Sequence, residues 1–535
     1  MASLTPPPAK ALAFTEARGC KEWLNALPLT NIPQAQALVL EALQALNATD
    51  GDGLERLKCL ELMRDKIAFL QGEQRSRYFG KTLPLSPNDS NAWVTGRSLL
   101  EEMEAGYRLC LAAALADGGE LGRLVGLISQ RIVRYIGTQM LFHAMVYRRF
   151  DPLLWTRLHQ QYLDAEASGV AQERVKDSLE GDVGVSSVAE TYAQMVLIQA
   201  AFLSEMTAPQ MDFAEALLRL WARKVQILKE SAETNKGALD PLVVDLAKPI
   251  GARPQPRGTV APSQRVLDID QLSRSIRKRI HGLQSGEDLA TLGLPAEASA
   301  LDSLTELQRL HKLWCEGAPP RPAAMPASRP TAGLVFGLGE IHFFVSGGKP
   351  FEQPDKTREL TRQEKQDIEV FGRVREQTQS KMVAEFNYTV EAWALVDEML
   401  GAVRVQRPAT ASRGIGIGRL VGLRQGDTAP FYLGYLSELT HETDGRIIAT
   451  VTIFPGKPTP IAVRAGDARN RANAHWVQGF RLPAIEKLKI PESLIVPSSM
   501  GSRGRGVESW SEGAKETTVE AILDHGSDFD RVTVF

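Results

Sequence analysis

The sequence is poor in cysteine, with four in 535 residues. Cys20, Cys59, Cys110 and Cys315 lie far apart and form no CxxC pair. A zinc ribbon needs closely paired thiolates, so this spacing excludes one, and we expect no metal site. Scattered cysteines are typical of buried thiols in a reducing compartment.

The sequence also lacks an excess of either charge and lacks long apolar runs. Its 62 basic residues nearly balance 64 acidic ones, for a formal net charge of −2. This balance gives no indication of a nucleic-acid partner, which favours basic surfaces. No window approaches the run of about 18 apolar residues that a membrane span needs. Residues 1–14 lack the features of a secretory signal. We therefore expect a soluble, cytoplasmic protein without a membrane span.

Enzyme motifs are missing as well. The sequence contains no HExxH, GxSxG or paired-carboxylate signature in a suitable context. The eight histidines are dispersed. His143 in a helical pattern and His342 in an alternating pattern are typical of core residues. We expect no catalytic residue, no resident cofactor and no enzyme activity.

A glycine-rich stretch, RGIGIGRLVGLR, contains Gly414, Gly416 and Gly418. A dinucleotide-binding fingerprint needs a helix directly after such glycines, because the phosphate meets the helix N-terminus. Here the strand-like LVGLR follows. The pattern favours glycines in a bent or tightly packed strand.

Helical periodicity dominates the first half of the chain, and we predict a helical domain over 10–235. Two prolines break the pattern within residues 81–90, and Ser90 is a candidate N-cap for a long helix after them. Further helices are predicted over 186–205 and 209–230.

One stretch has the spacing of a tetratricopeptide repeat, with Trp155, Leu158, Tyr162 and Ala171 at the expected positions. No second copy follows 34 residues later. Two interpretations stay open here: an array of repeat-like helical hairpins, or aromatic residues that simply pack between helices.

A small α/β connecting region is predicted over 236–316. It contains a strand at Leu242–Leu246, a helix over 267–284 and another near 299–316. The basic residues of the first helix are typical of a solvated face rather than a phosphate site. Residues 317–332 follow, with five prolines, and predict a domain linker.

Beyond the linker the patterns are mostly those of strands. Residues 333–348 predict two strands broken by Gly337 and Gly339, residues 358–380 a helix, and residues 476–535 five further strands. The predicted fold class is multidomain, with an N-terminal all-α helical array and a C-terminal, mainly β region.

Residues 391–464 carry the densest run of strand and turn signals, ending in FYLGYLSELTHETDGRIIATVTIFPGKPTPIAVR. This run resembles the core of the PilZ domain, a small β-barrel that binds cyclic di-GMP in bacteria. The resemblance implies a PilZ-like barrel over 333–465 and a further β unit over 466–535. Longer stretches are similar to large proteobacterial cyclic-di-GMP-binding proteins, namely RSRYFGKTLPLSP, LWTRLHQQYLDAE, LVVDL and DFDRVTVF.

The resemblance also implies ligand-binding residues. PilZ domains use an RxxxR motif before the barrel and a DxSxxG turn between two strands. Arginine suits this ligand because it binds phosphates in a bidentate manner and stacks on guanine. In this sequence the matching residues are Arg358 and Arg362, which form a literal RxxxR, or Arg373 and Arg375, with Asp397 and Gly401 in the turn. The serine is absent, and the turn is one residue shorter than the motif.

These residues lead to two main hypotheses. The first is a cyclic di-GMP receptor whose β domain binds the nucleotide and whose helical domain acts on an unidentified protein partner. The alternative is a degenerate PilZ-like interaction scaffold that binds no nucleotide. A third, an unrecognised hydrolase, would require carboxylates or histidines that converge in a pocket.

Overall fold

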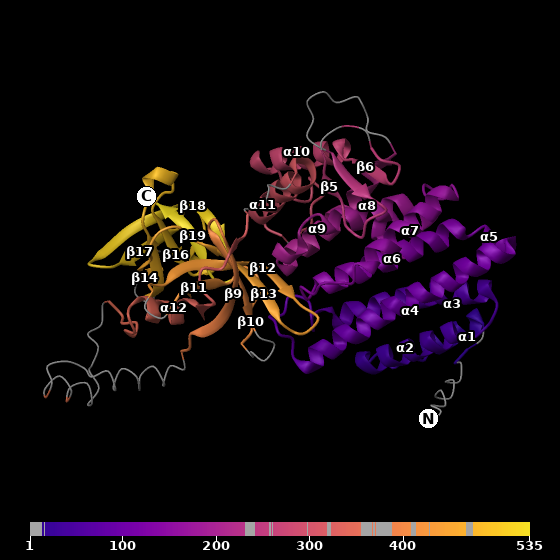
Figure 1. Cartoon of the computed structure of the whole chain (residues 1–535), viewed down its shortest axis with the longest axis horizontal. Helices are drawn as coiled ribbons and strands as arrows, with labels where there is room; N and C mark the ends of the chain where they lie inside the picture. Colours follow the sequence, from indigo (N-terminus) through magenta and orange to yellow (C-terminus); the bar gives the residue numbers. More distant parts are fainter. Residues whose placement is uncertain are drawn as a thin grey trace. The chain divides into compact units, whose positions relative to one another are not determined.

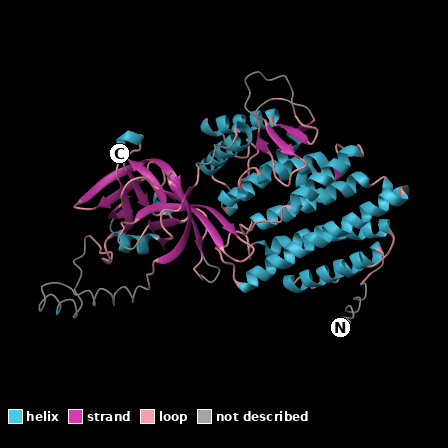
Figure 2. Ribbon diagram, viewed as in Figure 1, coloured by secondary structure: helices cyan, strands magenta, loops and turns pink. Residues whose placement is uncertain are grey.

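The computed structural model describes residues 13–14, 16–229, 241–255, 258, 260–296, 298–317, 323–354, 366, 370, 388–407, 413–426, 429–466 and 475–535, with only the main chain of residues 117, 182 and 183 (Figures 1 and 2). The chain divides into two compact units, Met1–Pro320 and Arg321–Phe535. The division falls within the proline-rich segment that was predicted as a linker.

The first unit consists mainly of helices. They are α1 (Ala17–Asn25), α2 (Ile32–Ala48), α3 (Gly53–Arg75), α4 (Pro87–Asp117), α5 (Gly119–Gly122), α6 (Val125–Ala144), α7 (Leu153–Ala167), α8 (Val188–Gln199) and α9 (Ala208–Trp221). Figure 1 shows α2, α4, α6 and α7 in successive layers, and α6 packs against α4, α7 and α8. Most of the length of α6 is buried, so this helix forms the centre of the unit.

The start of α4 differs from the prediction. The helix begins at Pro87, and Ser86 rather than Ser90 is its N-cap, accepting a hydrogen bond from the Asp89 main-chain N–H at 3.2 Å. Proline is well tolerated in the first helical turn, because the N–H that it lacks has no partner there. Pro87, one of the two prolines predicted to break the helical pattern, therefore starts the helix.

The residues with repeat-like spacing pack in the core. Trp155, Leu158 and Tyr162 lie buried on α7, and the Tyr162 ring stacks on Tyr192 of α8 with 4.4 Å between centroids. Helices α8 and α9 end earlier than predicted, since α9 gives way to the strand β3 (Gln226–Leu228).

A small antiparallel sheet completes the first unit, with strand order β3-β6-β4-β5. Its other strands are β4 (Leu242–Asp245), β5 (Arg253–Pro254) and β6 (Gln264–Asp268), followed by α10 (Asp270–Gln284) and α11 (Ala300–His311). The Trp314 indole, just after α11, donates a hydrogen bond to the Leu197 carbonyl of α8 at 2.9 Å. The sheet and its helices are thus built onto the helical array.

The second unit contains two six-stranded barrels. The first is formed by β8 (Thr331–Phe336), β9 (Glu391–Met399), β10 (Ala402–Arg407), β11 (Leu420–Arg424), β12 (Tyr432–His441) and β13 (Ile447–Ile453). They pair in the order β10-β13-β12-β11-β8-β9, and pairing of β9 with β10 closes the ring. The two-residue strand β7 (Met325–Pro326) pairs with the outer part of β9.

The second barrel is closed in the order β14-β15-β16-β19-β18-β17. Its strands are β14 (Thr459–Ala465), β15 (Val477–Leu482), β16 (Ser493–Val496), β17 (Gly506–Trp510), β18 (Ala514–His525) and β19 (Asp530–Val534). The sequence analysis placed β14 in the barrel over 333–465. In the structure β14 pairs with β15 and β17 instead, because Ile461 and Val463 pack inside the second barrel.

Two predicted strands are not strands in the structure. Residues 338–345 form α12 (Leu338–Val345), since Gly337, with φ of +89°, ends β8, and the apolar residues after it follow helical spacing. Gly414, Gly416 and Gly418 lie in the irregular segment before β11. The helix predicted over 358–380 lies outside the described residues, apart from residues 366 and 370.

The close approach of β12 and β13 generates a stability prediction. A Cβ added to Gly434 would lie 2.3 Å from the Thr452 carbonyl oxygen, closer than real Cβ atoms come. We expect Gly434→Ala to destabilise the first barrel by about 1–3 kcal/mol, measured as faster hydrogen exchange of β12 and β13 amides. Gly513→Ala is the control, since its Cβ would meet nothing within 4 Å. Equal protection in both variants would contradict the expectation.

Candidate functional site

The turn predicted to bind ligand is the hairpin between β9 and β10. Gly401 lies in it with φ of +76°. Asp397 lies directly opposite Arg404, and the Arg404 Nε donates to Asp397 Oδ2 at 2.9 Å. The neighbouring strand thus already supplies a cation to this carboxylate. Among the described residues, its buried Oδ1 has no hydrogen-bond partner.

The structure brings only part of the predicted site together. Asp397 and Gly401 share the hairpin, whereas Arg358, Arg362, Arg373 and Arg375 lie outside the described residues. Described residues resume at 388, just before β9 begins at Glu391. At about 3.4 Å per residue, the six residues from Glu391 to Asp397 span roughly 20 Å. The barrel end around Glu391 is therefore far from Asp397.

Three arginines that the sequence analysis did not select lie at that end of the barrel, and we call them the arginine cluster: Arg407, Arg413 and Arg419. Arg407 is 1% exposed. Its guanidinium lies 5.5 Å from the Trp393 ring centre, its Nη1 donates to the Arg413 carbonyl at 2.5 Å, and its Nη2 lies 3.4 Å from Glu391 Oε2. Within the described part of the chain, its Nε and Nη2 atoms nevertheless have no hydrogen-bond acceptor. Burial lowers the pKa of Arg407, so this cation is incompletely compensated.

The other two arginines of the cluster share an aromatic ring. The guanidinium carbons of Arg413 and Arg419 each lie 5.8 Å from the Phe336 ring centre. Arg413 binds both carboxylate oxygens of Glu340, and these hydrogen bonds raise its pKa. Arg419 donates to the Gly414 carbonyl at 2.6 Å. Both side chains are about one-third exposed, at 31% and 28%.

A carboxylate from the second barrel completes this surface. Asp528 Oδ1 accepts a hydrogen bond from the Leu420 main-chain N–H at 2.8 Å, and its Oδ2 lies 3.8 Å from Arg419 Nε. Burial raises the pKa of Asp528 despite these contacts. Guanidinium groups over aromatic rings, beside carboxylates, can stack on a planar base and bind phosphate. In the sequence, the signal for this cluster is the arginine at each end of RGIGIGR, Arg413 and Arg419. The stretch was interpreted from its glycines alone.

The helical unit contains a buried ion network around Asp177, which is fully buried. Asp177 accepts hydrogen bonds from Arg64 Nη2 at 2.7 Å, from Arg134 Nε at 2.9 Å and from Gln130 Nε2 at 2.9 Å. Burial alone would raise the pKa of Asp177, but Arg134, Arg64 and Arg131 outweigh it and hold the pKa well below its ordinary value. The network joins α3, α6 and the segment before α8.

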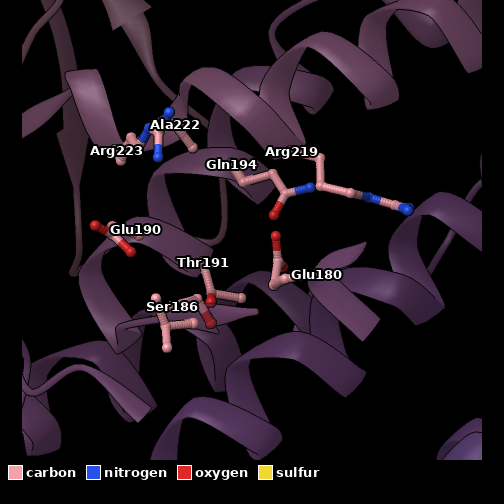
Figure 3. A pocket seen from close by; sticks show the side chains of 9 residues that line it. Glu180, Ser186, Glu190, Thr191, Gln194, Arg219, Ala222 and Arg223 are labelled. Carbon is pink, nitrogen blue, oxygen red and sulfur yellow. The ribbon is translucent and has the colours of Figure 1, made fainter. Parts of the chain in front are cut away.

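A cleft of about 590 Å³ lies beside this network, among α3, α6, α8 and α9. Its walls include Tyr78, Phe142 and Met195, and Arg75 and Arg219 line it too. Gln194 of α8 separates the cleft from a small polar void of about 10 Å³. Figure 3 shows the side chains that line this void, with the ends of Gln194 and Glu180 turned toward one another.

Within the described residues, no group of three or more histidine, cysteine or acidic side chains is placed to hold a metal ion. Of the helices in the described ranges, none combines the length and the apolar character needed to cross a bilayer.

Comparison with known proteins gives one match. Residues 18–232 match the family model for the N-terminal domain of the cyclic-di-GMP receptor FimW. The helical unit is similar to a receptor domain. The match spans α1 to α9 and β3 and does not include the barrels. No curated protein and no solved structure matches the chain.

The network around Asp177 predicts an acid-sensitive helical unit. The pKa of Asp177 is lower in the folded than in the unfolded state. Asp177 therefore makes its full contribution to stability at pH values above its unfolded-state pKa of about 4. That contribution is lost as the pH falls below 4 toward the folded value. We expect Asp177→Asn to lower the free energy of unfolding at pH 7 by about 3–5 kcal/mol, because it leaves buried guanidinium charge uncompensated.

Urea unfolding between pH 3 and pH 7, followed by helical circular dichroism, measures this effect. The variant should lose part of the acid sensitivity of the original protein. Asp50→Asn, at an exposed position, is the control. A similar midpoint for the original protein and Asp177→Asn at pH 7 would show that the network contributes little.

Proposed function

We propose that this chain is a cyclic di-GMP receptor that binds the nucleotide in its β unit and acts on a protein partner through its helical unit. The observation that carries the proposal is the match of residues 18–232 to the N-terminal domain of a cyclic-di-GMP receptor. The PilZ resemblance of the strands is a second line of support, and it favours a ligand site in the barrels.

The arginine cluster has the chemistry that this ligand requires. Cyclic di-GMP carries two phosphates and two guanines, which call for cationic donors and planar stacking surfaces. Arg413 and Arg419 are partly exposed beside Phe336, and Arg407 holds N–H groups without acceptors behind them. The carboxylates of Glu340 and Asp528 can accept hydrogen bonds from the donor edge of guanine.

The arginines predicted from the PilZ motif lie outside the described residues. Arg358, Arg362, Arg373 and Arg375 precede β9, and β9 begins beside Arg407 at Glu391. We therefore propose that this segment contributes phosphate contacts together with the arginine cluster. Asp397 and Gly401, at the far end of β9, remain the competing location.

Calorimetric titration of the full chain with cyclic di-GMP tests the proposal. Arg413→Ala should weaken binding by about 10- to 150-fold, because a hydrogen bond to a charged group contributes about 1.5–3 kcal/mol. Arg446→Ala is the matched control, an exposed arginine that pairs with Asp444 in the β12–β13 turn. Asp397→Asn should leave the affinity unchanged.

Two outcomes of the titration would contradict the proposed receptor function or the proposed location of the site. Absence of heat at high ligand concentration with the original protein would overturn the receptor proposal. Loss of binding in Asp397→Asn, with Arg413→Ala unaffected, would move the site to the hairpin.

The second candidate function is an interaction scaffold that binds no nucleotide. The ion pairs of Arg413 with Glu340 and of Asp397 with Arg404 favour it, because these charges already have partners inside the barrel. Under this hypothesis the original protein gives no heat with cyclic di-GMP, and its thermal midpoint does not change when the nucleotide is added.

A further inference from the structure

The cleft of the helical unit has the dimensions of a ligand site. Its volume of about 590 Å³ lies within the roughly 300–1,000 Å³ typical of small-molecule pockets. Four helices supply its walls, so the helical scaffold positions the lining side chains. The sides are apolar or aromatic, from Phe142 of α6 and Met145 directly after it to Met195 and Ile198 of α8. Such walls suit a flat, weakly polar ring.

Two residues with polar side chains line this cleft, Gln194 of α8 and Tyr78 just after α3. Gln194 is 5% exposed and Tyr78 is 2% exposed, so little of either residue reaches solvent. The amide offers a donor and an acceptor side by side, and the hydroxyl offers one of each. A ligand with a hydrogen-bonding edge would satisfy both residues.

Cationic groups lie along the same cleft. Arg75 and Arg219 line it, and each pairs with a carboxylate of α9: Arg75 with Asp212, and Arg219 with Glu215 at 2.9 Å. All four side chains are at least 25% exposed, and exposed ion pairs of this kind contribute little stability. Either guanidinium can therefore turn to an anionic ligand at small cost.

We infer that the cleft among α3, α6, α8 and α9 binds a purine nucleotide, whose base meets Gln194 and Tyr78 and whose phosphate meets Arg75 or Arg219. A glutamine amide matches the adjacent donor and acceptor of a purine edge, and the aromatic and methionine walls match its faces. This site lies in the helical unit and is separate from the arginine cluster, so it stands whether or not the barrel binds nucleotide.

Gly72 of α3 provides a direct way to close the cleft. It lines the cleft, and a Cβ added there would meet nothing within 4 Å. Gly72→Trp should therefore fill the cleft without a clash at Cβ. Gly72→Ala is the matched control, since it changes the same backbone position and leaves the cleft open.

The polar contacts are tested separately. Gln194→Leu and Tyr78→Phe each remove the hydrogen-bonding group and keep most of the side-chain volume. Gln199→Leu is the control, because Gln199 lies on the same helix with an unpartnered Nε2 and does not line the cleft. Circular dichroism checks that each variant is folded. Tyr78→Phe removes only a hydroxyl group, so this variant can still be titrated if another variant fails to fold.

The full chain and each variant are titrated by calorimetry with cyclic di-GMP, GMP, AMP and inorganic phosphate. We expect at least one purine nucleotide to bind in the cleft. This cleft binding, as distinct from any binding that Arg413→Ala weakens, should be abolished in Gly72→Trp and weakened about fivefold in Gln194→Leu and Tyr78→Phe. Gly72→Ala and Gln199→Leu should bind like the original protein. Comparing the affinities for GMP and AMP with the affinity for cyclic di-GMP shows whether the cleft binds a mononucleotide or the cyclic dinucleotide.

Two results would overturn the inference. One is that no purine nucleotide gives heat, or that phosphate alone binds. The other is that nucleotide binding is unchanged in Gly72→Trp and Gln194→Leu. If cyclic di-GMP binds and only Arg413→Ala weakens it, the receptor proposal stands and the cleft site fails.

Discussion

The helical unit depends on the placement of one carboxylate. Asp177 is fully buried and receives Arg64 from α3 and Arg134 from α6, so it fixes the distance between those helices. Unlike apolar packing, an ion network of this kind tolerates little displacement, because every unpaired charge is costly in the interior. The cleft lies beside it: Arg134 belongs to both the network and the cleft wall. The shape of the cleft thus follows from the geometry of the ion pairs.

The β unit depends on a different constraint, a core that belongs to both barrels. Val335, Leu420 and Leu433 of the first barrel cluster with Phe480 and Ile495 of the second, and α12 contributes Ile341. The arginine cluster lies where the barrels meet, since Arg419 of the first faces Asp528 of the second. A ligand at this surface would contact residues whose positions depend on the packing of both barrels.

Sequence patterns predicted the element types well where a periodicity was long and uninterrupted. The helices up to α9 and the strands β15 to β19 show this. Predictions failed where short apolar runs were ambiguous, as at residues 338–345, whose apolar residues fit both strand alternation and helical spacing and which form α12. Local patterns do not encode pairings between residues that are distant in the sequence. For this reason they did not predict the closure of the barrels or the membership of β14 in the second barrel. The arginine cluster and the cleft arise in the same way, from residues brought together only by the fold.

The shared core has a consequence for how the β unit is divided. Only residues 454–458 connect β13 to β14, and the core residue Phe454 lies at their start. Dividing the chain at this point would expose part of the aromatic rings of three core residues, Phe454, Phe480 and Phe529. Exposed apolar surface of that kind promotes aggregation. We therefore expect the two barrels to fold as one cooperative unit, and neither to be stable when it is expressed without the other.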